Sequence, residues 1–162
     1  MSEQPVSAMV ESAARVLKDA ACRLYGPRLV SIALFGSAAR GVATPESDLD
    51  VLVVADELPK GRMSRAREFE RVETEVETAL AAKCLPLSPV FKSREEVRRG
   101  SPLLWDMTEY VVLLYDKDDF LQHVLEATRE RLRQLGARRV VRGNAWYWVL
   151  KEDFTPGEVF TI

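Results

Sequence analysis

The feature that most restricts how this chain can fold is a pair of short apolar segments, Leu29–Phe35 and Asp48–Val54, on either side of a glycine-containing turn. Both segments are short and bounded by turn or polar residues, which predicts buried strands. Gly36 permits a sharp turn where the first strand ends, and the stretch Gly36–Gly41 can open a short helical turn. The sequence therefore predicts two buried strands separated by a tight turn and a loop.

Apolar residues recur at three-to-four spacing in three long segments of the chain. This spacing predicts amphipathic helices over Pro5–Tyr25, Lys60–Lys83 and Asp118–Leu135. A capping pattern that starts at Ser93 predicts a short helix, and a further short helix or turn is expected within Ser101–Tyr110.

Two more strands are expected, over Leu85–Phe91 and Val111–Tyr115. The first of them contains Pro86 and Pro89, which have no N–H to donate to a neighbouring strand. We therefore expect this strand to be bent or to lie at an edge of its sheet.

The length of 162 residues and the charge balance suit one globular domain. A formal net charge of −2 gives no bulk attraction to nucleic acid or to an anionic membrane. We predict a main domain over residues 1–136 and a β-like extension over 137–162 packed on it. Without a run of 18 apolar residues or a signal-peptide core in Met1–Pro5, a cytoplasmic location without membrane contact is expected.

Cysteine and histidine offer little to a metal site in this sequence. Cys22 and Cys84 are far apart and lack the spacing of metal ligands, so both are expected to be reduced core residues. His123 is the single histidine and is expected at the surface of its helix.

The stretch that carries chemistry is Gly36-Ser37, followed by Asp48 and Asp50. Ser37 offers a hydroxyl and a backbone N–H at the start of a helical turn, a place that suits a phosphate. Asp48 and Asp50 are two apart on a strand, so their side chains share a face. Two close carboxylates suit Mg²⁺ when substrate phosphates complete its coordination shell. Either motif alone is commonplace, but the two in this order and spacing indicate a site for a nucleoside triphosphate.

The residues Gly36-Ser-Ala-Ala-Arg-Gly41 and Ser47-Asp-Leu-Asp-Val-Leu-Val-Val54 resemble the signature of the minimal nucleotidyltransferases, of the DNA polymerase beta-like superfamily. The resemblance implies an α/β (α+β) fold, with a mixed sheet and helices mainly on one face. It also implies transfer of a nucleoside monophosphate, with ATP the expected donor, to an acceptor hydroxyl. Gly36, Ser37 and Arg40 would bind the nucleotide, while Asp48 and Asp50 would be catalytic and hold Mg²⁺ or Mn²⁺.

The sequence departs from the family pattern at one position. Active members use a third carboxylate on the strand after the helix, and here Ser88 best occupies that place. Serine at neutral pH is neither an anionic ligand nor a strong base, although a bend at Pro89 could return Glu95 or Glu96. The alternative to an enzyme is therefore a weak or inactive member that acts as antitoxin and partner of a HEPN-domain toxin. A nucleotide sensor without catalysis is a third hypothesis.

Other conspicuous side chains favour structural roles. An aromatic set, composed of Trp105, Trp146, Tyr147 and Trp148, could stack a base, but packing is the favoured interpretation. The arginines of Arg129–Arg142 are interpreted mainly as a solvated face rather than as an RNA contact. The aromatic tail and a proline-containing edge strand leave room for a homodimer.

Overall fold

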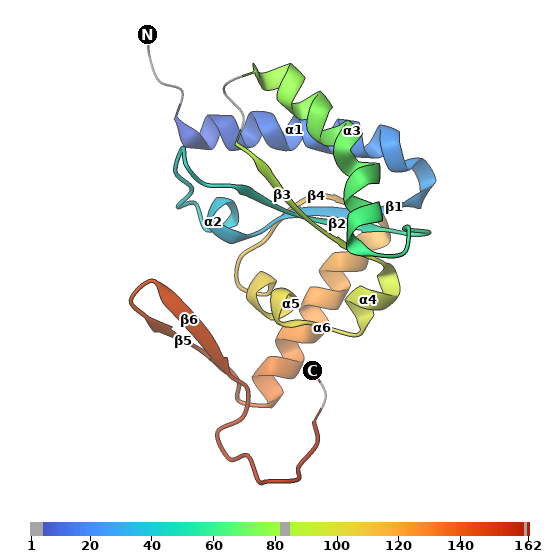
Figure 1. Cartoon of the computed structure of the whole chain (residues 1–162). Coiled ribbons are helices and arrows are strands. Elements are labelled where there is room, and N and C mark those ends of the chain that lie inside the picture. Colours follow the sequence, from blue (N-terminus) through green and yellow to red (C-terminus); the bar gives the residue numbers. More distant parts are fainter. Residues whose placement is uncertain (1–4, 82–84, 161) are drawn as a thin grey trace.

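The computed structural model describes residues 5–81, 85–160 and 162 of the chain, and the predicted elements are found there with ends shifted by a few residues. Figure 1 shows the elements, whose bounds are α1 (Val6–Tyr25), η1 (Gly26–Arg28), β1 (Leu29–Leu34), α2 (Gly36–Ala39), β2 (Leu49–Ala55), α3 (Arg62–Leu80), β3 (Leu87–Lys92), α4 (Arg94–Arg98), α5 (Pro102–Met107), β4 (Val112–Asp116), η3 (Lys117–Asp119), α6 (Phe120–Gln134), β5 (Arg138–Arg142) and β6 (Ala145–Val149).

A mixed sheet lies at the centre of the molecule, in the strand order β3-β2-β1-β4. β1 is antiparallel to both β2 and β4, whereas β2 and β3 run parallel. The mixed sheet expected from the resemblance is confirmed. β3 lies at an edge, as predicted, because an edge strand can tolerate Pro89, a residue without an N–H.

Helices cover both faces of the sheet, which differs from the expectation of one mainly covered face. α1 and α3 pack on one face, where Leu17 and Phe69 are fully buried. α4, α5 and α6 cover the other face, where Leu104 and Leu121 are fully buried (Figure 1). The physical reason lies in β2, because both its alternating sets of side chains include apolar residues and each set requires cover.

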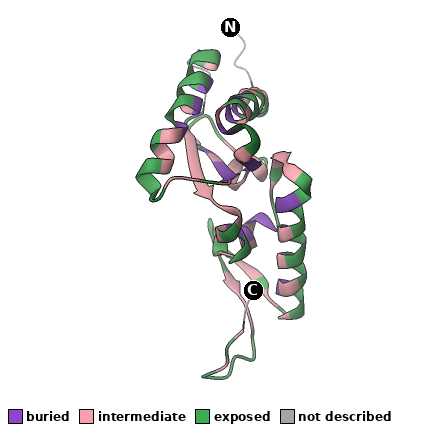
Figure 2. Ribbon diagram, turned by 90° about the vertical axis from the view of Figure 1, so that its right-hand side faces the viewer, coloured by how far each residue is buried: buried purple, intermediate pink, exposed green. Residues whose placement is uncertain are grey.

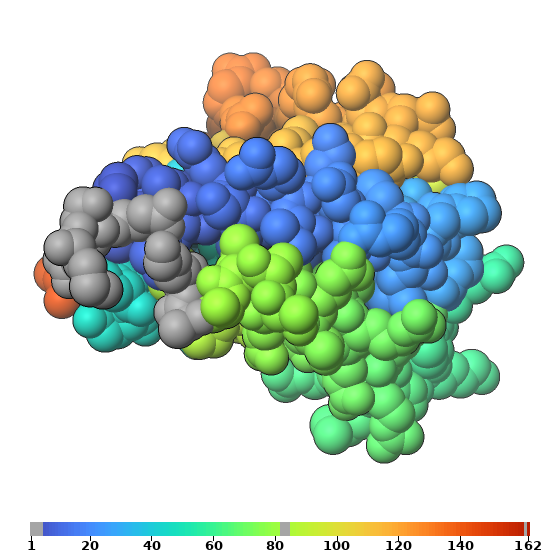
Figure 3. All heavy atoms as spheres, turned by 90° about the horizontal axis from the view of Figure 1, so that it is seen from above, coloured from blue at the N-terminus to red at the C-terminus, as the bar shows by residue number. Residues whose placement is uncertain are grey.

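The burial of side chains follows this layering. Figure 2 shows buried residues where helices meet the sheet, whereas the β5–β6 hairpin carries intermediate and exposed residues. Seen from the α1 side in Figure 3, α1 and α3 lie side by side across this face of the molecule. Because helices cover both faces of the sheet, we expect a binding site at the ends of its strands.

The start of α6 depends on a carboxylate supplied by the end of β4. Asp116 accepts hydrogen bonds from the backbone N–H groups of Leu121 and Gln122, both at 2.9 Å. The same carboxylate accepts a hydrogen bond of 2.6 Å from the hydroxyl of Ser31, which is buried in β1. The central strand and α6 are thus joined through one side chain, and such capping contacts contribute about 1 kcal/mol each.

The tail after α6 begins with a β-hairpin, β5–β6, which has Gly143 and Asn144 in its turn and forms the first part of the predicted β-like extension. The rest of the predicted β-like extension, 150–162, contains no strand among its described residues. In the described ranges, no helix is long and apolar enough to cross a membrane.

The cysteine and histidine predictions have mixed outcomes. Cys22 is a free thiol, partly buried against the α1–α3 core. Cys84 lies outside the described residues. His123 is exposed on α6, as expected.

Candidate active site

The turn after β1 is packed directly against a carboxylate of β2. Gly36 begins α2 with a φ of 65°, in the left-handed region that favours glycine. A Cβ built on Gly36 would lie 2.0 Å from Oδ2 of Asp50, well inside van der Waals contact. In addition, the backbone N–H of Phe35 donates to the carbonyl of Asp50 at 3.1 Å. The glycine of the motif is therefore required by the close approach of Asp50.

The two aspartates of the motif differ in environment. Asp48 is exposed just before β2, whereas Asp50 is half-buried within it. Burial raises the pKa of the Asp50 carboxyl, and the nearby charge of Asp48 raises it further, while Arg40 and a hydrogen bond with Ser88 act in the opposite direction. A bound cation would relieve both unfavourable effects, so this pair of carboxylates fits a divalent metal ion.

Asp50→Asn is expected to stabilise the metal-free fold at pH 7. Because the folded-state pKa of Asp50 is raised, the ionised carboxylate costs stability as the pH rises from the unfolded pKa through the folded one. The amide removes that cost. Urea denaturation with a chelator should show a gain at pH 7 that shrinks as the pH falls towards about 4, the unperturbed pKa of aspartate, and is lost below it. Equal stability of the two proteins at pH 7 would contradict this prediction.

Ser88 lies beside Asp50, where the family pattern calls for an acid. The parallel register pairs Asp50 with Ser88, and the two side chains share a hydrogen bond. Among the described residues, no group of three or more acidic, histidine or cysteine side chains could hold a metal ion.

The two later acids are not returned to the site by a bend at Pro89. β3 continues to Lys92, which pairs with Val54, four residues along β2 from Asp50 and so about 13 Å away. Glu96 then caps α4 through the Ser93 N–H, at 2.7 Å. Glu95 is exposed and pairs with Arg99. Both glutamates therefore have partners at the opposite end of the sheet.

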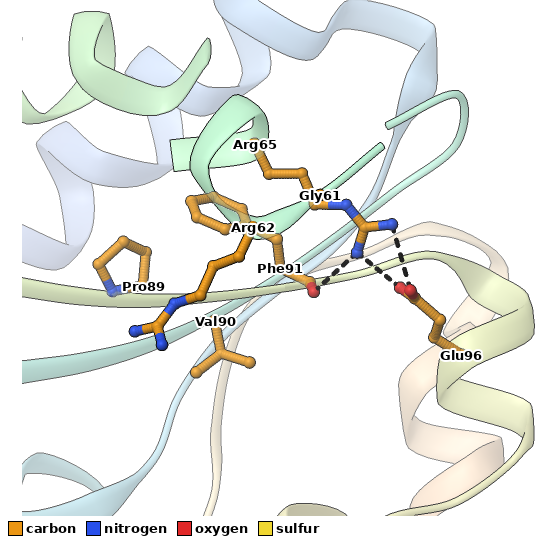
Figure 4. A pocket seen from close by; sticks show the side chains of 7 residues that line it. All are labelled: Gly61, Arg62, Arg65, Pro89, Val90, Phe91 and Glu96. Atoms are coloured by element: carbon orange, nitrogen blue, oxygen red, sulfur yellow. Dashed lines mark hydrogen bonds and ion pairs between the residues drawn. The ribbon is translucent and has the colours of Figure 1, made fainter. Parts of the chain in front are cut away.

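A cavity of about 480 Å³ lies at that opposite end, between the start of α3 and β3 (Figure 4). Arg65 crosses it and donates two hydrogen bonds to Glu96, of 2.8 and 3.1 Å, and one of 3.2 Å to the carbonyl of Phe91. The hydrogen bond from Arg65 is the main cause of the lowered pKa of Glu96. This cavity is larger than the one at the motif, but its Arg65 and Glu96 are paired with each other and it contains none of the motif residues.

A second cavity, of about 230 Å³, contains the motif. Gly36, Arg40 and Asp50 line one side of it. Ser37 and Asp48 adjoin these residues in the chain without lining the cavity. Of the five predicted site residues, the structure thus gathers three around one cavity and leaves two at its margin.

The other side of this cavity comes from segments that the sequence analysis did not assign to the site. Asp106 of α5, together with Arg139 and Trp146 of the hairpin, lines it. Asp106 Oδ1 accepts hydrogen bonds from the indole N–H of Trp146 at 3.0 Å and of Trp148 at 2.8 Å. The available signal was the spacing of the two tryptophans, which places both indoles on one face of a strand.

Comparison with known proteins agrees with this fold. Residues 14–101 match the family model described as a nucleotidyltransferase domain. A candidate protein adenylyltransferase of Methanocaldococcus jannaschii is 31% identical over 113 residues, covering 68% of this chain and 75% of the relative.

Solved structures match this chain at lower identity. A crystal structure of a toxin–antitoxin with AMP-PNP matches with a TM-score of 0.50 and 20% identity, covering 78% of this chain and 88% of that one. A chain from the complex of a tri-AMPylated Shewanella oneidensis HEPN toxin with an MNT antitoxin has a TM-score of 0.43 and 16% identity, covering 76% and 92% of the two chains.

The central mixed sheet, with the glycine turn packed against Asp50, fits the nucleotidyltransferase domain that the family model describes. The chain belongs to the nucleotidyltransferase domain family.

Proposed function

We propose that this protein binds ATP and transfers its adenylyl group to a hydroxyl of another protein. The observation that carries the proposal is the contact between Gly36 and Asp50, which builds the turn and the acid as one unit around a cavity. The name of the Methanocaldococcus jannaschii relative supports the adenylyl group and a protein acceptor. The AMP-PNP in the toxin–antitoxin structure is consistent with the same nucleotide.

Each motif residue has a distinct part in this proposal. Ser37 and the backbone of Gly36 hold phosphate oxygens, and Arg40 neutralises part of their charge. Asp48 and Asp50 would hold Mg²⁺ or Mn²⁺, which would neutralise charge on the reacting and leaving oxygens when bound. Ser88 orients the carboxylate of Asp50 through their hydrogen bond.

In the transfer, the acceptor oxygen forms a bond to the α-phosphorus and the bond to the bridging oxygen of pyrophosphate breaks. The acceptor hydroxyl also loses its proton. Asp50 is the motif acid that lines the cavity, so we assign it the acceptance of this proton. Ser88 cannot act as a carboxylate and so cannot assist this proton transfer. We therefore expect deprotonation of the acceptor hydroxyl to limit the rate of the reaction.

The test is incubation with ATP labelled at the α-phosphate, Mg²⁺ or Mn²⁺, and candidate acceptor proteins. We expect label on an acceptor, and a loss of labelling of about 10²-fold or more in Asp50→Ala, in line with the removal of a metal ligand and base. A matched control is Asp153→Ala, which removes an exposed carboxylate of the tail. Labelling that is unaffected by Asp50→Ala would refute the proposed enzyme.

A second candidate function is favoured by the position of Ser88. A site with two carboxylates and a serine can bind a nucleotide and yet transfer slowly, and such a member could act as the antitoxin of a HEPN-domain toxin by binding alone. The HEPN toxin complex among the structural relatives belongs to that kind of pair. Co-expression with the product of a neighbouring helical reading frame tests it. Failure of the two proteins to copurify, together with normal adenylyl transfer, would remove this candidate.

A further inference from the structure

The β5–β6 hairpin forms a wall of the nucleotide cavity although it lies beyond residue 101, where the match to the family model ends. Two of its side chains, Arg139 and Trp146, face the same space as Gly36 and Asp50. The hairpin is attached there through Asp106, whose Oδ1 accepts both indole N–H bonds. Its cavity-facing residues are thus held relative to the motif by hydrogen bonds to α5.

The indole ring of Trp146 contacts two guanidinium groups, those of Arg40 and Arg139. The guanidinium carbon of Arg40 lies 5.0 Å from the centre of its indole ring, and that of Arg139 lies 4.6 Å from it. Both distances are within the range of favourable cation–π contacts. Because the indole is fixed by Asp106, it holds a guanidinium of the motif and a guanidinium of the hairpin near each other.

Arg139 is also incompletely satisfied. Its side chain is 18% exposed, and its Nε is buried without a hydrogen-bond partner among the described residues. Asp106 forms an ion pair with that nitrogen at 4.0 Å, which is beyond hydrogen-bond distance, and its Oδ1 already accepts two indole N–H bonds. A buried donor without a partner is costly, and an anionic oxygen in the cavity would satisfy it.

We propose that Arg139 is a further phosphate-binding residue of this site, supplied by the hairpin and positioned by Trp146 and Asp106. The proposal rests on the proposed nucleotide site. Two guanidinium groups held near one indole repel each other, and a phosphate chain is the part of a nucleotide that relieves this repulsion. A guanidinium also matches phosphate oxygens with two parallel N–H donors. The triphosphate would then be bound by the motif loop on one side and by Arg139 of the hairpin on the other.

The test is titration calorimetry with Mg²⁺ and two probes, a non-hydrolysable ATP analogue and inorganic tripolyphosphate. Arg139→Gln should weaken the binding of both probes by about tenfold, the effect expected for a charge-assisted hydrogen bond. Arg139→Lys should recover part of this loss because it keeps the charge. The matched control is Arg138→Gln, the neighbouring hairpin arginine, whose side chain is paired with Glu152 instead and should bind both probes normally.

The possible outcomes separate this proposal from the nucleotide site itself. Failure of the unmodified protein to bind either probe would overturn both. Normal binding by the unmodified protein and equal binding by Arg139→Gln would overturn the role of Arg139 alone. A loss for the ATP analogue without a loss for tripolyphosphate would overturn it too, since the contact would then be with the nucleoside.

Discussion

Gly36→Ala is expected to abolish nucleotide binding and to destabilise the fold by about 2–4 kcal/mol. Two costs combine, because alanine is strained at a φ of 65° and its Cβ would lie 2.0 Å from Oδ2 of Asp50. Either the carboxylate or the turn must move. Since both belong to the proposed site, we expect at least about a 10²-fold loss of ATP affinity, equivalent to about 2.7 kcal/mol. Calorimetric titration and urea denaturation measure the two effects.

Gly41→Ala is the matched control for this substitution. Gly41 ends the same motif loop with a φ of 71°, yet a Cβ built there meets nothing within 4 Å among the described residues. The Gly41→Ala variant should therefore lose only the stability that backbone strain costs, about 1 kcal/mol, with little change in its affinity for ATP. If Gly36→Ala and Gly41→Ala behave alike, then contact with Asp50 is not what Gly36 provides.

Ser88→Asp is expected to increase adenylyl transfer by about 10²-fold, the contribution typical of a well-placed general base. Asp50 pairs directly with Ser88 across β2 and β3, so the new carboxylate would join the other two at one point. Without metal the three acids repel one another, and the variant should be less stable than the parent. Added Mg²⁺ or Mn²⁺ should reverse that loss. The initial rate of label transfer from ATP and the metal dependence of the melting temperature measure both effects.

Ser88→Asn is the appropriate control, because it has nearly the size of aspartate without its charge. We expect it to show neither the rate increase nor the metal-dependent stability. A Ser88→Asp variant no faster than the parent would mean that the site lacks more than an acid, and it would strengthen the role of binding partner over that of enzyme.

The strands and helices were predictable from sequence because their signals are local. Leu29–Phe35 and Asp48–Val54 are apolar and bounded by turn residues, and they became β1 and β2 with small shifts. The start of α6 was less well predicted. Asp118 and Asp119 precede it with left-handed φ angles of 54°, and the carboxylate at its N-terminus comes from Asp116, which also accepts the hydroxyl of Ser31. That arrangement depends on strand pairing, which local spacing does not report.

The candidate site likewise has one part that could be predicted from local sequence and another part that could not. The motif in Gly36–Asp50 was found from its residue order, and three of its members line one cavity. The opposite wall was missed because Arg139 and Trp146 are more than 85 residues from Asp50 in the chain, and Asp106 stands in a short helix without a recognisable motif. We interpreted the tryptophans as packing residues, and two of them do anchor the hairpin through Asp106. Their placement at the cavity beside Gly36 and Asp50 follows from tertiary contacts alone.

The pairing of β1 with β4 has a consequence for how the protein emerges from the ribosome. β1 can pair with β2, which follows it closely, but its other edge stays open until β4 has been synthesised, 85 residues beyond Ser31 in the case of Asp116. Contacts so distant in sequence form late and slow folding. The nascent chain therefore exposes one edge of its central strand while the motif is already made. Closing that edge and starting α6 become a single late step, since one carboxylate serves both.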